Sequence, residues 1–202
     1  MTAPLTAGVL LAAGHSRRWG EGNKLLALWN GRPLASWAVD SLLRAPVDLR
    51  AVVLRDPQLA ALMPGLNPLA PQGDDQAASL RVAVAWAERQ GAARLLILLA
   101  DMPALPDAVI AAVLDGCADR PCGVRHPDGR IVVPACFPAP MFPQLGDITG
   151  DRGAGALLRG ADAVAAPAEA LIDVDRPEDL PGRGQPLRSD HNPLPQAPPK
   201  NP

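Results

Sequence analysis

Three short runs of consecutive apolar residues constrain the fold of this chain more than any other feature. They lie within residues 8–12, 50–55 and 94–100. Continuous apolar runs of this length are typical of strands that are buried on both faces. Because segments with helical spacing separate the runs, the pattern predicts an α/β fold with a mostly parallel sheet that is covered on both faces.

The segments around these strands carry helix and turn signals. In residues 76–90 the apolar side chains fall on one helical face, and Asp56 before Pro57 is typical of an N-cap followed by the first helical position. Residues 122–125 and 131–133 form a predicted hairpin, because a Pro-Asp-Gly turn separates them. Helices are predicted at 33–44, 56–64, 76–90, 106–114, 138–145 and 153–159.

Charge and composition exclude several classes of function. The chain has 202 residues, a net charge of −2, a pI near 5.9 and 3% aromatic residues, whereas nucleic-acid-binding proteins usually carry a basic excess. The first apolar run, residues 8–14, is far shorter than the roughly 20 residues that span a bilayer, and no basic segment precedes it. We therefore expect no nucleic-acid partner, no membrane association and a cytoplasmic location.

Cys117, Cys122 and Cys136 are the three cysteines, and they cannot all pair within one chain. Their spacing is not that of a C-x-x-C motif, which favours reduced thiols and agrees with a cytoplasmic location. A zinc site is the weaker alternative, because the three histidines are scattered along the sequence.

The composition changes near residue 180. Seven of the 22 residues from 181 onward are proline, and hydrophobic periodicity is lost there. We predict one domain over residues 1–180 and an extended or disordered tail over residues 181–202. This tail either has no function or binds a partner through its prolines.

A loop rich in glycine and basic residues follows the first predicted strand. It reads LAAGHSRRWGEGNK from residue 11 to residue 24. Small residues let the backbone approach a ligand, glycine lets successive N–H groups point at one anion, and arginine and lysine neutralise phosphate oxygens. The loop is neither a G-x-G-x-x-G dinucleotide motif nor a Walker P-loop. We interpret it as a phosphate-binding loop, the alternative being an ordinary strand-to-helix loop with exposed basic side chains.

A carboxylate ends the third apolar strand. Asp101 is followed by Met and Pro, at the sheet edge where we expect the first loop. Mg²⁺ is commonly held by one or two carboxylates together with ligand phosphates, so a metal site is predicted here, the alternative being a turn or helix cap. Asp173 and Asp175 either assist this site or cap the segment before Pro177.

Together these segments resemble the MobA-like nucleotidyltransferases, and among them most closely the molybdenum cofactor cytidylyltransferases. The resemblance rests on L-A-A-G-x-S-x-R-x-G…N-K-L-L in the first loop and on D-M-P after the third strand. Four further stretches add to it: NGRPL at 30–34, GDDQAASL at 73–80, TGDRGA at 149–154 and IDVDRPEDL at 172–180. It covers residues 7–180 and implies a Rossmann-like, three-layer nucleotidyltransferase fold of GT-A type.

The resemblance implies a role for each matched residue. Lys24, Arg18 and Asp101 would be catalytic: the two cations would offset charge on the leaving pyrophosphate, and Asp101 would coordinate Mg²⁺. The nucleotide would contact Leu11, Ala12, Ala13, Gly14, Ser16, Arg18, Lys24, Ser79 and Asp101. The acceptor would contact Pro134, Gly150, Asp151, Arg152 and Gly153.

The chain departs from the family pattern mainly on the acceptor side. Residues 132–137 lack the glycine and the basic or polar residue that the cytidylyltransferases tend to carry there. Gly155 replaces an arginine that often follows TGDRGA, and Ala78 replaces the first serine of a frequent pair. These departures concern pterin binding and some base contacts, while the nucleotide side is nearly intact.

The resemblance implies a Mg²⁺-dependent transfer of CMP from CTP to molybdopterin cofactor. A phosphate oxygen of the acceptor would attack the α-phosphorus in line, and pyrophosphate would leave. The product would serve a molybdenum hydroxylase. Guanylyl transfer, or transfer to another phosphorylated acceptor, remains open. A second class is a non-catalytic binding module or chaperone for nucleotide and cofactor, which the joint presence of Lys24, Arg18 and Asp101 disfavours.

Overall fold

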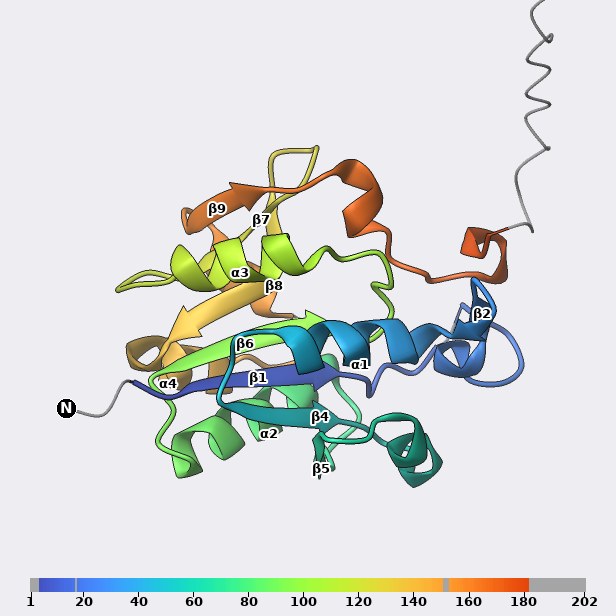
Figure 1. The fold of residues 1–202 in the computed structure, drawn as a ribbon. Helices are drawn as coiled ribbons and strands as arrows, with labels where there is room; N and C mark the ends of the chain where they lie inside the picture. Colours follow the sequence, from blue (N-terminus) through green and yellow to red (C-terminus); the bar gives the residue numbers. More distant parts are fainter. Residues whose placement is uncertain (1–3, 17, 151–152, 182–202) are drawn as a thin grey trace, which may run out of the picture.

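The computed structural model describes residues 4–16, 18–150 and 153–181. Its centre is a seven-stranded sheet in the order β5-β4-β1-β6-β8-β7-β9 (Figure 1). The strands are Thr6–Leu11 (β1), Leu49–Val53 (β4), Asn67–Leu69 (β5), Arg94–Leu99 (β6), Cys122–Arg125 (β7), Ile131–Pro138 (β8) and Asp162–Ala165 (β9). Leu28–Trp29 (β2) and Arg32–Pro33 (β3) form a second, antiparallel pair.

Helices connect the strands. The α-helices of the described residues are Leu34–Arg44 (α1), Gln76–Arg89 (α2), Asp107–Asp115 (α3) and Phe142–Gly146 (α4). The 3₁₀ helices are Lys24–Leu26 (η1), Pro57–Leu62 (η2), Ala139–Met141 (η3), Ala154–Leu158 (η4), Ala168–Leu171 (η5) and Pro177–Asp179 (η6).

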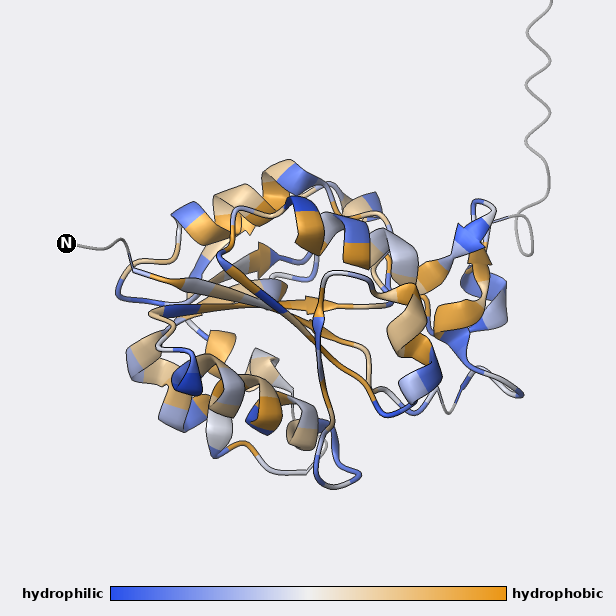
Figure 2. Cartoon of the chain, turned by 60° about the horizontal axis from the view of Figure 1, so that its bottom comes forward, coloured by the Kyte–Doolittle hydropathy of each residue, from blue (hydrophilic) through white to orange (hydrophobic). Residues whose placement is uncertain are grey.

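The helices cover both faces of the sheet, which is therefore the middle of three layers (Figures 1 and 2). On one face α1 and α3 pack over a core that includes Leu10, Leu96 and Leu98. On the other face α2 and α4 pack over Val9 and Ile97. Since successive side chains of a strand point to opposite faces, a strand between two helical layers must be apolar at every position. This explains the continuous apolar runs, and the predicted three-layer α/β fold is confirmed.

Strand direction determines which loops meet. β5, β4, β1 and β6 are parallel, so their carboxyl ends lie at one edge of the sheet. β8 is antiparallel to both β6 and β7, as expected for the predicted hairpin. β8 continues beyond the predicted residues 131–133 to Pro138, because residues 135–138 remain paired with residues 94–97 of β6.

Several short elements differ from the pattern-based expectation. β5, β9 and the β2–β3 pair have two to four residues each, which is too short for a recognisable apolar alternation. Residues 57–62 and 154–158 are 3₁₀ rather than α helices, and 3₁₀ geometry is common in helical pieces this short. The N-cap prediction at Asp56 is confirmed, since its carboxylate accepts the N–H of Gln58 at 2.9 Å.

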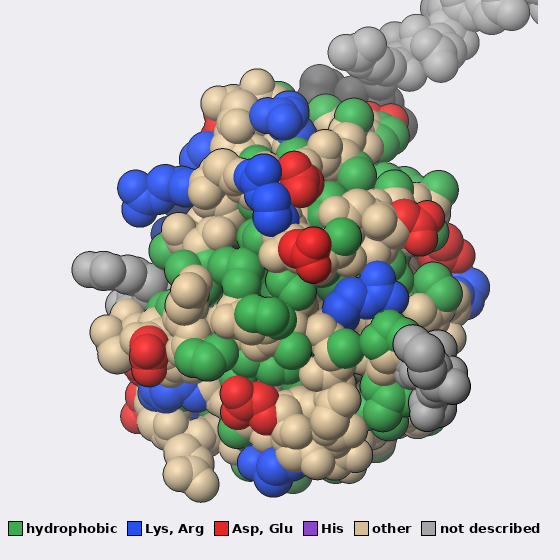
Figure 3. Space-filling model, turned by 90° about the vertical axis from the view of Figure 1, so that its left-hand side faces the viewer, with side chains coloured by type: hydrophobic (Ala, Val, Ile, Leu, Met, Phe, Trp, Pro, Cys, Tyr) green, Lys and Arg blue, Asp and Glu red, His purple; other side chains and the backbone are tan. Residues whose placement is uncertain are grey.

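The surface at the sheet edge where β1 and β6 begin is mixed in character. Figure 3 shows hydrophobic, acidic and basic side chains interspersed on this face. In the described part of the chain, no helix combines the length and apolar character needed to cross a membrane. Cys117, Cys122 and Cys136 are buried and are not paired in disulfides. The predicted tail lies outside the described residues, except for Pro181.

Candidate active site

A pocket of about 580 Å³ opens at the sheet edge where β1 and β6 end. Ligands of open α/β sheets usually bind at this edge. The loop after β1, the start of α2, the beginning of β8 and residues 173–175 all contribute to its walls. Of the predicted site residues, its lining includes Leu11, Ala13, Gly14, Ser16, Arg18, Lys24, Ser79, Asp101 and Gly153.

The loop after β1 is shaped by backbone conformations that small residues allow. Ser16 has φ +49°, and its carbonyl accepts the N–H of Trp19 at 2.8 Å. Gly20 and Gly22 have φ of +87° and +90°, a region that glycine adopts without steric cost. Asn23 then caps η1 by accepting the N–H of Leu25 at 3.0 Å. The cap fixes the first residue of η1, Lys24, whose side chain reaches into the pocket.

Lys24 lies between two carboxylates. Its ammonium is 2.6 Å from Asp101 Oδ2 and 3.0 Å from Asp175 Oδ1, and its side chain is only 9% exposed. Burial lowers the pKa of Lys24, but the facing Asp101, joined by Asp175 and Asp173, raises the pKa overall. The side chain is therefore a fixed positive charge at neutral pH.

Asp175 joins both predicted cations of the pocket. It accepts hydrogen bonds from Lys24 and from Arg18 Nη1, the latter at 2.8 Å. Burial opposes ionisation of Asp175, but the hydrogen bond and charge of Lys24, followed by Arg18, lower its pKa. Asp175 therefore connects the first loop to residues 173–175. Of the two roles that the sequence left open for Asp175, assisting the site or capping the segment before Pro177, these contacts favour the first.

Three carboxylates converge beside Lys24. One oxygen each of Asp101, Asp173 and Asp175 lies within 4.8 Å of the others. Val174 explains the convergence: its side chain is fully buried and its N–H donates to the Asp101 carbonyl at 3.1 Å, so residues 173 and 175 flank a fixed anchor. Desolvation by the surrounding protein atoms, followed by repulsion from Asp101, raises the pKa of Asp173 to about 7.

This carboxylate group fits a divalent cation. Asp101 Oδ1 is buried and has no hydrogen-bond partner among the described residues, an arrangement that is costly unless something binds the oxygen. Oxygen donors are the ligands that hard cations such as Mg²⁺ and Mn²⁺ prefer. The sequence singled out Asp101 alone as the metal ligand, whereas the fold adds Asp173 and Asp175.

A family model described as the MobA-like NTP transferase domain matches residues 8–167. The chain belongs to the MobA-like NTP transferase family. It is an enzyme of the nucleotidyltransferase type.

Individual members of this family are similar over nearly their whole length. Purine catabolism protein PucB of Bacillus subtilis strain 168 is 32% identical over 198 residues, which cover 89% of this chain and 96% of PucB. A molybdenum cofactor guanylyltransferase of Cereibacter sphaeroides is 31% identical over 193 residues, which cover 91% of this chain and 97% of that protein.

The similarity extends to a protein of known structure, which has also been solved with a metal ion. Rv0371c from Mycobacterium tuberculosis H37Rv aligns with a TM-score of 0.76 at 28% identity, over 89% of this chain and 96% of that chain. A structure of Rv0371c in complex with manganese has a TM-score of 0.68 at 25% identity, over 82% of this chain and 89% of that chain. A related protein thus binds a divalent metal.

Not every predicted residue of this MobA-like domain lines the pocket. The side chain of Ala12 is 5% exposed and packs in the core under α1, because the alternation along β1 directs it away from Ala13. Pro134 is likewise buried, and its neighbours Val132 and Val133 line the pocket instead. Asp151 and Arg152, predicted to face the acceptor, lie outside the described residues, as does Arg17 of the first loop.

Arg55 is a pocket residue that sequence reasoning missed. Its Nε donates to the Ala13 carbonyl at 3.0 Å, and its Nη1 donates to the Gly73 carbonyl at 2.7 Å and to Asp74 at 3.1 Å. Arg55 therefore joins the first loop of the MobA-like domain to the segment before α2. It follows the end of β4, so the strand-end rule that singled out Asp101 could have found it.

Asp75 fixes the start of α2 and a second loop at once. Its carboxylate accepts N–H groups from Ala78 at 3.1 Å and from Gly150 at 3.0 Å, and it pairs with Arg81 at 2.9 Å. Arg81 Nη1 also donates to the Ile148 carbonyl at 3.2 Å. Gly150 does not line the pocket; Asp75 and Arg81 instead hold its segment against α2, next to the predicted acceptor residues.

Proposed function

We propose that this MobA-like enzyme transfers CMP from CTP to molybdopterin cofactor in the presence of Mg²⁺. An oxygen of the acceptor phosphate forms a bond to the α-phosphorus while the bond to the β-phosphate bridging oxygen breaks, so pyrophosphate leaves. The observation that carries the proposal is the pairing of Lys24 with Asp101 at 2.6 Å and with Asp175 at 3.0 Å beside a loop of small residues.

The chain's own groups would bind and orient the triphosphate. The acceptor phosphate is already a nucleophile, so no general base is needed, and rate enhancement comes from positioning and charge stabilisation. Lys24 and Arg18 supply positive charge for the β- and γ-phosphates, while backbone groups at Ala13 and Gly14 approach the nucleoside. Asp101, with Asp173 and Asp175, would hold Mg²⁺, which neutralises charge on phosphate oxygens when bound.

The base and the acceptor rest on resemblance. The motif pattern favours the cytidylyltransferases, and therefore CTP and molybdopterin cofactor, with a molybdenum hydroxylase as recipient of the product in the cytoplasm. Guanylyl transfer is the second candidate, because a relative that is 31% identical over 91% of this chain is named a molybdenum cofactor guanylyltransferase.

The test is a matrix of nucleotides and acceptors. The full chain, Mg²⁺ and purified molybdopterin cofactor are mixed with CTP, GTP, ATP or UTP in turn, and pyrophosphate release is measured. We expect the highest kcat/KM with CTP, together with a product that contains one CMP per pterin. A preference for GTP would replace cytidylyl by guanylyl transfer. Tight cofactor binding without pyrophosphate release under any of the four nucleotides would overturn the enzymatic proposal in favour of a carrier.

A further inference from the structure

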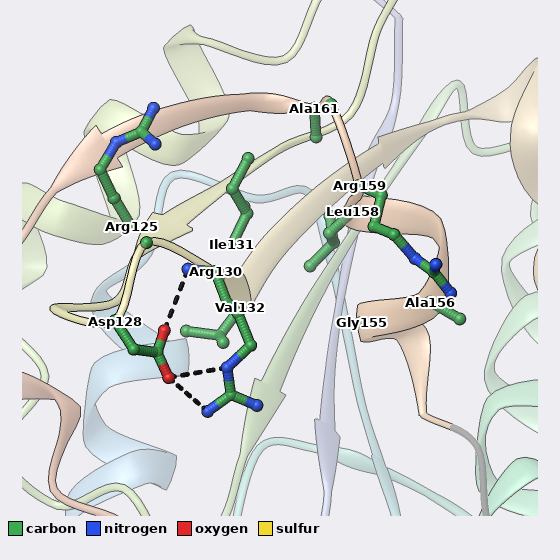
Figure 4. A pocket seen from close by; sticks show the side chains of 12 residues that line it. Arg125, Asp128, Arg130, Ile131, Val132, Gly155, Ala156, Leu158, Arg159 and Ala161 are labelled. Carbon is green, nitrogen blue, oxygen red and sulfur yellow. Dashed lines mark hydrogen bonds and ion pairs between the residues drawn. The ribbon is translucent and has the colours of Figure 1, made fainter.

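A second hollow, of about 790 Å³, lies beside β7 and the start of β8 (Figure 4). The end of β7, the turn into β8 and the segment from η4 to Ala161 form its walls. Its volume falls within the range of small-molecule sites, roughly 300–1,000 Å³. Its lining includes none of the individual nucleotide or acceptor contacts that the resemblance implies, although Val132 and Gly155 belong to stretches where the chain departs from the acceptor side of the family pattern.

Three arginines surround this arginine hollow. Arg125 ends β7, Arg130 follows the turn, and Arg159 follows η4 (Figure 4). Arg130 pairs with Asp128, its Nε and Nη2 each 2.7 Å from Oδ2. Neither Arg125 nor Arg159 has a side-chain hydrogen bond or ion pair with another described residue. The lining of the hollow therefore carries three positive charges and one carboxylate, and the excess positive charge favours an anionic ligand.

The floor of the arginine hollow is apolar. Leu158 is 1% exposed, and Ile131 and Val132 are half-buried beside it. Figure 4 places Ile131 and Leu158 between Arg125 and Arg159. A bare inorganic anion gains nothing from such a floor, whereas an organic ligand can bury its body there and pair its charged groups with guanidinium forks.

The arginine hollow is continuous with the nucleotide pocket. Val132 and Gly155 line both of them. A molecule that fills the hollow therefore abuts the nucleotide, as an acceptor must in order to bring its phosphate to the α-phosphorus. Gly155 has no atom within 4 Å of a Cβ position, so this junction is open.

From these observations we propose that the arginine hollow binds the distal, anionic end of the phosphorylated acceptor, whose reacting phosphate lies in the nucleotide pocket. The inference rests on the proposed function and specifies its acceptor: an organic molecule with a negatively charged end remote from its phosphate. A concave site that shares residues with the nucleotide pocket favours this ligand over an acidic protein surface, which would need a flatter contact.

The experiment compares three variants with a matched control. Arg125→Ala, Arg159→Ala and the double variant remove the two arginines without a described partner, and Arg89→Ala removes an exposed arginine at the end of α2, remote from both pockets. Pyrophosphate release is measured with molybdopterin cofactor as the varied substrate at saturating CTP. We expect each single variant to raise the acceptor KM about 10-fold, since a hydrogen bond to a charged group typically contributes that much, and the double variant about 100-fold. KM for CTP, thermal unfolding and the Arg89→Ala enzyme should be unchanged.

Direct binding keeps the inference separate from the proposed reaction. Equilibrium binding of molybdopterin cofactor is followed by its pterin fluorescence, with a non-hydrolysable CTP analogue present. If the wild type binds the cofactor without turnover and the double variant binds it at least 10-fold more weakly, the proposed reaction fails and the arginine hollow stands as its binding site. If the wild type releases pyrophosphate and the double variant keeps the wild-type acceptor KM, the acceptor-binding role of the arginine hollow is overturned and the proposed reaction stands. Loss of capture of a molybdenum hydroxylase at unchanged acceptor KM would assign the arginines to a protein partner and also overturn the proposal.

Discussion

The cations of the nucleotide pocket are paired with carboxylates, whereas two of the three arginines of the arginine hollow have no partner among the described side chains. In the nucleotide pocket, Lys24 is 9% exposed and contacts two carboxylates, and Arg18 shares one of them. In the arginine hollow, Arg125 and Arg159 are exposed and pair with no described side chain. The two sites lie side by side and share Val132 and Gly155, so the difference is not one of position in the fold.

The difference indicates how each site would work. Paired cations are fixed before the substrate arrives, which is what stabilisation of developing phosphate charge requires. Arginines without partners keep their side-chain freedom until a ligand orders them, so they contribute to affinity and choice of acceptor. We therefore expect changes in the nucleotide pocket to act on kcat and changes in the arginine hollow to act on the acceptor KM.

The largest effect should come from Asp101. Asp101→Asn removes the charge of the carboxylate whose buried Oδ1 has no hydrogen-bond partner among the described residues, and we expect pyrophosphate release to fall by about 10²–10³. Thermal unfolding checks that the variant folds. Asp115→Asn, an exposed carboxylate at the end of α3, is the matched control and should be fully active. Retention of more than half of the activity by Asp101→Asn would remove Asp101 from the metal site.

Lys24 tests whether preorganised charge matters for the rate. Lys24→Gln leaves Asp101 and Asp175 facing each other without a cation, so we expect kcat to fall about 100-fold. The unfolding free energy should also fall by about 1–3 kcal/mol, because carboxylates lose their partner. Arg89→Gln serves as control. An unchanged kcat with a raised KM for CTP would mean that Lys24 contributes binding alone, which would weaken the contrast with the arginine hollow.

The fold was predictable because its central strands carry a signal that no other element mimics. Residues 95–100 are apolar at every position, since helices cover both faces. β9 and β5 were not predictable, because they lie at the sheet edges, are three or four residues long and bury little. Their place in the sheet depends on pairing with β7 and β4 rather than on their own pattern.

The site was predictable in part for a related reason. Residues at the end of a continuous apolar strand, such as Asp101, stand out, and Lys24 lies within a compact loop motif. Asp173 and Asp175 reach the pocket only because Val174 is buried and bonded to Asp101, a contact across more than 70 positions that spacing cannot reveal. The arginine hollow was missed because its three arginines come from segments with no shared motif.

Asp75 lines the nucleotide pocket and also holds the segment at Gly150, so its loss should affect the use of both substrates moderately. Asp75→Asn weakens the pairing with Arg81 and the contact to Gly150, which hold residues 148–150 against α2. We expect kcat/KM for the acceptor to fall about 10-fold through misplacement of this segment, with a smaller change for CTP. Asp56→Asn alters a comparable N-cap outside both pockets and is the control. An equal fall of kcat/KM for the acceptor and for CTP would mean that residues 148–150 support the nucleotide pocket and not acceptor binding.

The smallest effect is the pH dependence of stability that Asp75 confers. The hydrogen bond from Arg81, opposed by desolvation and supported by the N–H groups of Gly150 and Ala78, lowers the pKa of this carboxyl. A carboxyl with a lower pKa in the folded protein stabilises it fully above its unfolded pKa, and this contribution is lost as pH falls through the folded pKa. Denaturant unfolding should therefore give a difference between wild type and Asp75→Asn that is constant from pH 7 to about 5 and shrinks below about 4. A difference that persists unchanged to about pH 2.5 would mean that charge on Asp75 does not hold the segment. The attachment of residues 148–150 to α2 would then rest on the direct hydrogen bond from the Ala77 N–H to the Gly150 carbonyl at 3.1 Å.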